Sequence, residues 1–375
     1  MTERLALLLR QEADTLDVPA PDAAGIVGDG RRLRRRRRAV EGVALVAVVA
    51  AVGAIAVVVP RIGGGSSELP AASAAELEGW AVASGSTVQL GTGQTVHVDG
   101  KVKSVYYTSA GVLVRAGAEA ATDAPDSTYT LVDADGQTSD FALELGDRVP
   151  GTDPTQPYLA YAEKTDDPGR WDVVLRDVRT GDVYRNIPVN GTFTWGGWVA
   201  PPVALSGSHV YVGLDDATLD IAWKDATVTR ATTLPASNMP TVAGGRVVLE
   251  NDRTEVVRVV DAQTGEVLLE LPQADRLLSL SPDGTHAIAV PWRSCDDEDT
   301  CTWDKPTAIV YDLATGRHRE IDIRDASYGW TPAGDLLRVD QDSVDVCQPD
   351  TAICHSTPVT VHGRSLRLGG TSYES

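Results

Sequence analysis

The sequence lacks the short motifs that mark the common catalytic and nucleotide-binding sites. It contains no Gly-x-Ser-x-Gly nucleophile elbow, no His-Glu-x-x-His zinc motif, no P-loop and no dinucleotide fingerprint. Each of these motifs fixes a nucleophile, a metal ion or a phosphate group at a defined place on its fold. We therefore predict a protein that is not an enzyme, with no catalytic residue, no bound cofactor and no metal site.

Histidine is scarce and scattered, whereas carboxylates are plentiful. His209 and His286 occupy matching places just before a second inner strand, which favours a role in turns over a metal site. The alternative is a group of carboxylates that binds a cation or performs acid–base chemistry on a sugar. No single pair of carboxylates stands out for that role. The six histidines are His97, His209, His286, His318, His355 and His362.

Cationic residues are outnumbered, and many of them lie near the N-terminus. The chain holds 33 Lys/Arg against 53 Asp/Glu, a net charge of −20. Residues 61–375 alone hold 24 Lys/Arg against 46 Asp/Glu, a net charge of −22. Because phosphate backbones are bound by basic surfaces, this acidic part is not expected to bind nucleic acid.

Cysteine is limited to four residues, all in the second half of the chain. An even number of cysteines in an oxidising compartment predicts disulfides, and the spacings suggest the pairs Cys295–Cys301 and Cys347–Cys354. Zinc is the alternative, but neither pair has the two-residue gap of a zinc knuckle. The acidic run 296–299 between the first two cysteines predicts a solvated loop tip, with binding of calcium or a basic partner as the alternative.

Long apolar runs are absent except for one. Gly42–Val59 holds 18 residues without a charged or strongly polar side chain, and its neighbours extend it to 39–60. An Arg-rich block at 31–38 precedes it, and the positive-inside rule keeps such a block in the cytoplasm. We predict a single transmembrane α-helix in the plasma membrane lipid bilayer, with the N-terminus cytoplasmic. A cleaved signal peptide and a buried core helix are the alternatives.

This topology divides the chain into four parts. They are a cytoplasmic tail (1–38), the membrane span (39–60), a flexible Gly/Ser-containing linker (61–79) and an extracytoplasmic domain (80–375). Leucines on one face predict a short amphipathic helix over residues 1–17. That helix offers a site for a cytoplasmic partner or lies along the inner leaflet, and a weakly ordered tail is the alternative.

Beyond Trp80 the sequence alternates short strands with turn residues every 8–12 positions, which is typical of all-β folds. Three predicted hairpins share the turn Asp-x-x-Thr-Gly, at 177–181, 261–265 and 312–316. In this turn the Asp accepts hydrogen bonds from the turn's own amides, and the Gly adopts a positive φ. Weaker copies lie at 133–136, 225–227 and 349–351. A period in the forties with four strands per unit predicts a β-propeller.

Counting these hairpins gives a six-bladed propeller. Upstream of most hairpins lies a more apolar strand pair, since inner strands are buried on both faces. The interval that contains Cys295 and Cys301 is longer than the others and predicts a loop insertion within one blade. The hairpin at 88–98 and the last strands, 359–361 and 365–368, are left over. Either these N- and C-terminal strands join in one blade and so close the ring, or they build a seventh blade.

Short repeat motifs carry a resemblance to known propellers. Ser281-Pro282-Asp283-Gly284 resembles the turn of WD40-like and TolB-type repeats, and the Asp-x-x-Thr-Gly hairpins resemble those of PQQ-like repeats. The whole arrangement is similar to that of actinobacterial membrane-anchored propeller proteins, and 28 Arg against 5 Lys suits a GC-rich genome. The resemblance covers about residues 80–370. It implies the fold but no activity, and the Trp-rich signature of quinoprotein blades is missing.

Together these observations predict a non-catalytic binding module. The ring presents its loops to an extracellular protein, peptide or glycan. Trp195 and Trp198 flank two glycines and are the candidate aromatic contact, with core packing as the alternative. Other possible functions are a transmembrane sensor or anti-sigma-like regulator acting through residues 1–30, and an exported propeller hydrolase or lyase.

Overall fold

The computed structural model describes residues 79–369 except for 121–126, 142, 144, 146, 147, 149, 195–198, 237–241, 252–255, 273–275, 292, 298, 299, 304–306, 323–326, 341, 352 and 360–365. No helix within these ranges is long and apolar enough to cross a membrane. The predicted helices at 1–17 and 39–60 lie outside the described residues.

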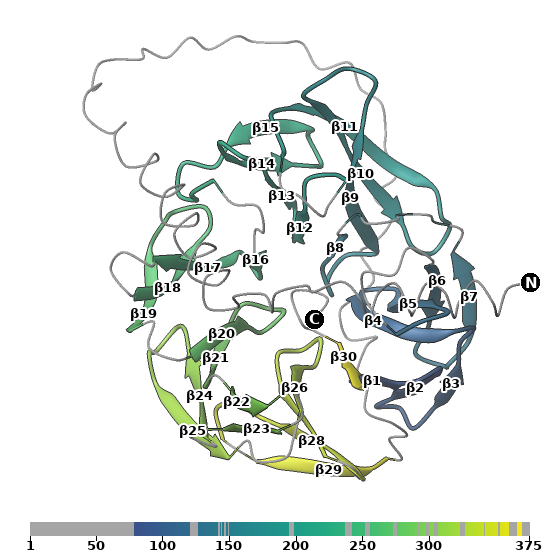
Figure 1. The fold of residues 1–375 in the computed structure, drawn as a ribbon, viewed down its shortest axis with the longest axis vertical. Coiled ribbons are helices and arrows are strands. Elements are labelled where there is room, and N and C mark those ends of the chain that lie inside the picture. The colour runs from purple at the N-terminus through teal and green to yellow at the C-terminus, as the bar shows by residue number, and fades with distance from the viewer. Residues whose placement is uncertain are drawn as a thin grey trace, which may run out of the picture. The chain divides into compact units, whose positions relative to one another are not determined.

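The described residues form a β-propeller of seven four-stranded antiparallel sheets arranged in a ring (Figure 1). Blade 1 consists of β1 (Ala81–Ser84), β2 (Thr87–Leu90), β3 (Thr95–His97) and β30 (Leu366–Leu368). Blade 2 consists of β4 (Lys101–Thr108), β5 (Gly111–Gly117), β6 (Thr128–Val132) and β7 (Thr138–Phe141). Blade 3 consists of β8 (Gly151–Thr152), β9 (Tyr158–Lys164), β10 (Arg170–Asp177) and β11 (Val183–Asn190).

The remaining four blades follow in chain order. Blade 4 consists of β12 (Val203–Ser206), β13 (His209–Gly213), β14 (Thr218–Ala222) and β15 (Thr227–Arg230). Blade 5 consists of β16 (Val242–Ala243), β17 (Arg246–Asn251), β18 (Val256–Asp261) and β19 (Val267–Pro272). Blade 6 consists of β20 (Arg276–Leu280), β21 (His286–Pro291), β24 (Thr307–Asp312) and β25 (His318–Asp322). Blade 7 consists of β26 (Ser327–Trp330), β27 (Leu336–Val339), β28 (Ser343–Cys347) and β29 (Cys354–Pro358).

The prediction of an all-β propeller is confirmed, but the count of six blades is wrong. The six predicted outer hairpins are those of blades 2–7. The seventh is blade 1, in which the leftover hairpin β2–β3 joins β1 and the C-terminal strand β30. Ala83 pairs with Arg367 across that junction. Strands from both ends of the domain therefore close the ring, and the blade that they form is the additional one.

Inner and outer strands differ in burial as predicted. Six of the seven residues of β5 are buried, whereas the outermost strand β11 buries only Ile187 and Val189. Buried side chains of neighbouring blades form shared clusters, and the largest joins blades 3 and 4 through residues such as Leu175 and Ile221. Burial of such side chains stabilises the fold by about 1.5–3 kcal/mol each. The seams between blades are therefore the core of the propeller.

The shared hairpin turn has the predicted chemistry. Asp177 accepts a hydrogen bond of 2.9 Å from the Arg179 amide, and Asp312 accepts one of 2.8 Å from the Ala314 amide. The glycines that close the three turns, Gly181, Gly265 and Gly316, have φ values of 77°, 72° and 69°.

The predicted insertion is confirmed too, because the two-stranded hairpin β22 (Arg293–Asp297) and β23 (Thr300–Trp303) lies in the chain between β21 and β24 of blade 6.

Candidate functional site

Three aromatic side chains meet where blade 3 packs against blade 4. Tyr158 begins β9, Tyr184 is the second residue of β11, and Trp223 follows β14. The two tyrosine rings stack, with centroids 4.7 Å apart and planes inclined by 29°. Trp223 presents an edge contact to both, at 5.3 Å from Tyr158 and 5.8 Å from Tyr184. Aromatic quadrupoles favour these arrangements, so the three rings hold one another in place.

The aromatic cluster has a buried base and an exposed top. Trp223 is 2% exposed, and its indole N–H donates a hydrogen bond of 3.1 Å to the Gly207 carbonyl. Tyr184 is 47% exposed. Burial raises the pKa of Tyr158, and the neighbouring Tyr184 and the charge of Asp177 raise it further, so its hydroxyl stays neutral at physiological pH.

A β-bulge directs Tyr184 to this seam. Leu175 pairs with Arg185 and Arg176 pairs with Val183, so Tyr184 is the extra residue in β11. A bulge of this kind re-aims the side chain that it inserts. The chain therefore brings two consecutive residues, Tyr184 and Arg185, to the side of β11 that faces blade 4.

Two cations lie against the aromatic rings. The Arg185 guanidinium carbon is 5.8 Å from the centroid of the Tyr184 ring, and Lys224 Nζ is 5.6 Å from that of Trp223. Arg185 Nη2 also donates a hydrogen bond of 2.9 Å to the Lys224 carbonyl. The cation–π contacts restrain both side chains, and the hydrogen bond restrains Arg185 further. The site thus presents an exposed aromatic ring with two positive charges beside it. We call these five residues, Tyr158, Tyr184, Arg185, Trp223 and Lys224, the seam site.

The next seam is polar instead. His209 Nδ1 lies 2.6 Å from Asp220 Oδ1, both in blade 4. Gln263 of blade 5 donates hydrogen bonds of 2.8 Å to the Asp220 carboxylate and to the Tyr211 hydroxyl. Burial is the largest cause that raises the pKa of Tyr211 to about 12. His209 and His286 do begin corresponding strands, β13 and β21, and His209 belongs to a network that links two blades.

The motif Ser281-Pro282-Asp283-Gly284 forms the first turn of blade 6. Asp283 accepts hydrogen bonds from the Ser281 hydroxyl at 2.6 Å and from the Thr285 amide at 3.1 Å. Asp335 lies in the equivalent turn of blade 7, where burial and then the charge of Asp283 raise the pKa of its carboxyl. Within the described ranges, no three His, Cys, Asp or Glu side chains are grouped so that they could hold a metal ion.

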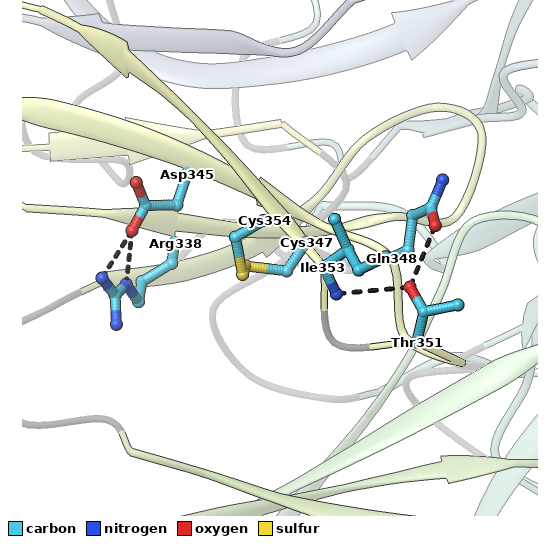
Figure 2. The surroundings of a disulfide bond; sticks show 7 residues. All are labelled: Arg338, Asp345, Cys347, Gln348, Thr351, Ile353 and Cys354. Carbon is cyan, nitrogen blue, oxygen red and sulfur yellow. Dashed lines mark hydrogen bonds and ion pairs between the residues drawn. A yellow bond between two sulfur atoms is a disulfide. The ribbon is translucent and has the colours of Figure 1, made fainter.

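The structure describes only part of the site residues predicted from the sequence. Cys347 and Cys354 form a disulfide that closes the outer hairpin β28–β29 (Figure 2). Cys295 and Cys301 stand opposite each other in β22–β23, and their disulfide stays a prediction because their side chains are outside the description. Trp195 and Trp198 lie outside the described residues, so their contact with a partner also stays a prediction.

Sequence reasoning did not find the seam site. Tyr184 and Arg185 follow the turn 177–181 after two intervening residues, and Trp223-Lys224 begins the corresponding turn of the next blade. Two neighbouring repeats with aromatic–cation pairs at their outer turns are therefore the pattern that would have identified it.

Neither a protein-family model nor a curated protein sequence matches the chain. Among solved structures, apo AztD from Citrobacter koseri is 12% identical over 78% of this chain and 97% of its own, with a TM-score of 0.47. TolB from Acinetobacter baumannii is 17% identical over 71% of this chain and 66% of its own, with a TM-score of 0.38. Hydrazine synthase from Kuenenia stuttgartiensis is 14% identical over 66% and 77%, with a TM-score of 0.42. The chain is a β-propeller that has TolB among its structural neighbours.

Proposed function

We propose that this protein is an extracytoplasmic binding module. Its propeller is held at the outer face of the cell membrane by residues 39–60 and binds a partner, without catalysis, at the seam of blades 3 and 4. The observation that carries this proposal is the exposure of Tyr184 on a buried aromatic base. Rigid, partly exposed tyrosines beside arginines are the residues that most often dominate the free energy of protein recognition.

The position outside the membrane is supported by the disulfide. The bond between Cys347 and Cys354 is of a kind that persists in oxidising compartments and is rare in the cytosol. The Arg-rich block at 31–38 ahead of the apolar run supports the same orientation. An enzymatic reporter that is active only outside the cytoplasm, fused after residue 70, is expected to be active, and an inactive fusion would contradict this topology.

The binding role is tested by capturing the partner in the native host. The full chain, carrying an affinity tag, is cross-linked in cells and purified. Tyr184→Ser should lose the cross-linked partner, because it removes the exposed ring and leaves Trp223 in place. The matched control is Val267→Ser, which removes an apolar side chain of 51% exposure from the corresponding hairpin of blade 5. Equal capture by Tyr184→Ser and the unsubstituted chain, at equal thermal stability, would overturn the proposal.

A further inference from the structure

We infer that Arg185 and Lys224 form a carboxylate-binding clamp, and that the ligand of the seam site is an acidic segment of a partner protein. This inference rests on the proposed binding function and names the chemistry of its ligand.

The first observation is that both cations lack an acidic partner in a strongly acidic domain. Residues 61–375 carry 46 carboxylates against 24 Lys/Arg, so a cation at the surface has many possible partners. Other exposed arginines of blades 3 and 4 use them, since Arg170 pairs with Asp167 and Arg230 with Asp216. Within the described part of the chain, Arg185 and Lys224 form no ion pair, although both side chains are exposed.

The second observation is that the fold holds the Arg185 guanidinium against the backbone of the residue that carries the second cation. The hydrogen bond from Arg185 to the Lys224 carbonyl ties the guanidinium to the residue that bears the ammonium group. Like charges near each other repel, and the repulsion grows where aromatic rings replace water. A bound anion would attract both cations and so offset that repulsion. Two cations fixed in this way are therefore prepared for a negatively charged ligand.

The third observation concerns the shape of the donors. An arginine has five N–H groups in a planar fork, and the bond to Lys224 involves only one of its nitrogens. The fork matches a carboxylate in a bidentate arrangement, and the cation–π contact with Tyr184 keeps the guanidinium beside the exposed ring. Lys224 adds a point charge from the neighbouring blade. The geometry suits a side-chain carboxylate that approaches along the seam.

Apolar surface on the face of blade 4 that carries the seam site favours a peptide over a glycan. Val228, which is 38% exposed, pairs with Ile221 across β14 and β15. Cross-strand partners lie on the same face of a sheet, and Ile221 is part of the core cluster between blades 3 and 4. Val228 therefore lies on the face of blade 4 that carries the seam site. Its methyl groups offer nothing to sugar hydroxyls but fit an apolar side chain between acidic ones.

The test measures binding of a defined probe to the full chain purified in detergent. The probe is a fluorescent decapeptide of alternating Glu and Tyr, and its control replaces every Glu by Gln. We expect the Glu peptide to bind and the Gln peptide not to bind. High salt should weaken the binding of the Glu peptide because exposed charges are screened. The double variant Arg185→Gln/Lys224→Gln should weaken binding by about tenfold or more. The double variant Arg170→Gln/Arg230→Gln, with the same change in charge on the same two blades, should bind like the unsubstituted chain.

Several results would overturn the inference. These are equal binding of the Glu and Gln peptides, equal binding by the two double variants, and absence of binding by the unsubstituted chain. Direct binding of fluorescently labelled polygalacturonate, without any binding of the peptide, would assign the site to an anionic glycan instead. Failure of the binding function itself is distinguishable. If the binding function fails, Tyr184→Ser will still capture the cross-linked partner. If only the clamp fails, Tyr184→Ser will lose the partner, whereas Arg185→Gln/Lys224→Gln will still capture it.

Discussion

Gln263 of blade 5 donates a hydrogen bond of 2.8 Å to the carboxylate of Asp220 in blade 4. The same Gln263 amide nitrogen lies 3.4 Å from Nδ1 of His209, the first residue of the second strand of blade 4. A contact between the first residue of a blade's second strand and the outer turn of the next blade also occurs at two other seams. His286 of blade 6 lies 3.4 Å from the Asp350 carboxylate of blade 7. At the seam of blades 3 and 4 this place is taken by Tyr158 and Trp223. The seam site is thus an aromatic version of a contact that is polar elsewhere.

Removal of the Gln263 side chain should loosen the seam of blades 4 and 5. Gln263→Ala leaves Asp220 and the Tyr211 hydroxyl without their donor from the next blade. We expect a loss of about 1 kcal/mol in the free energy of unfolding, or about 2–4 °C in Tm. Thermal unfolding followed by circular dichroism measures the loss. Gln137→Ala, at an exposed glutamine in the corresponding turn of blade 2, is the control and should leave Tm unchanged.

The repeats predict the outer turns well because those turns are local in sequence. An Asp that bonds to amides two or three residues ahead and a Gly with positive φ need no distant partner. Blade 1 could not be counted in this way, since β30 comes from the far end of the chain and the turn 91–94 contains no Asp. The seam site was missed for a similar reason. Its three aromatic side chains come from strands and turns of two blades. Only the packing of blade 3 against blade 4 sets the distances between them.

Ala226 occupies a position in the outer turn of blade 4 where other repeats place glycine. Its φ is 53°, in the left-handed region that side chains resist. Ala226→Gly should therefore stabilise the fold by about 1 kcal/mol, because the relief of strain exceeds the added flexibility of the unfolded chain. Ala314→Gly in the corresponding turn of blade 6 has no such strain to relieve and should lower Tm. A lower Tm for both variants would contradict this account.

Asp335 should contribute less to the stability of the propeller at neutral pH than at low pH. Burial and then the charge of Asp283 raise the pKa of Asp335 in the folded state. Its contribution to stability is therefore fully present below the unfolded pKa, about 3.9, and is lost as pH rises through the folded value. We expect Asp335→Asn to raise Tm at pH 7 and to have little effect on Tm near pH 3. A scan of Tm against pH for both chains checks this, and an unchanged or lower Tm at pH 7 would count against it.

Asp312 should behave in the opposite way. The hydrogen bond from the Thr315 hydroxyl is the largest cause that lowers its pKa, and the amides of Ala314 and Thr315 add to it against the effect of burial. A lowered pKa contributes stability that is present above the unfolded value and is lost as pH falls through the folded value. Asp312→Asn keeps an acceptor oxygen but removes the charge, so Tm should fall at pH 7 and converge with the unsubstituted chain near pH 3. Parallel Tm curves over the whole range would refute the assignment.

The outer hairpin of blade 7 carries a disulfide and lacks the Asp-x-x-Thr-Gly turn of blades 3, 5 and 6. Cys347 and Cys354 are seven residues apart, and a loop of that size restricts the unfolded chain by about 2–3 kcal/mol in the chain-entropy account. The double variant Cys347→Ser/Cys354→Ser should therefore lower Tm by several degrees. Reductant should lower the Tm of the unsubstituted chain by at least as much, because it opens every accessible disulfide.

Peptide mapping without reduction tests the pairing directly. It should link Cys347 with Cys354 and, as the sequence predicts and the register of β22–β23 allows, Cys295 with Cys301. Each link joins two strands of one hairpin, so neither connects separate blades. Reduction should then soften two local hairpins while the ring, closed by β1 and β30, stays assembled. Crossed links between the pairs, or loss of the whole fold on reduction at moderate temperature, would show that the disulfides act between blades instead.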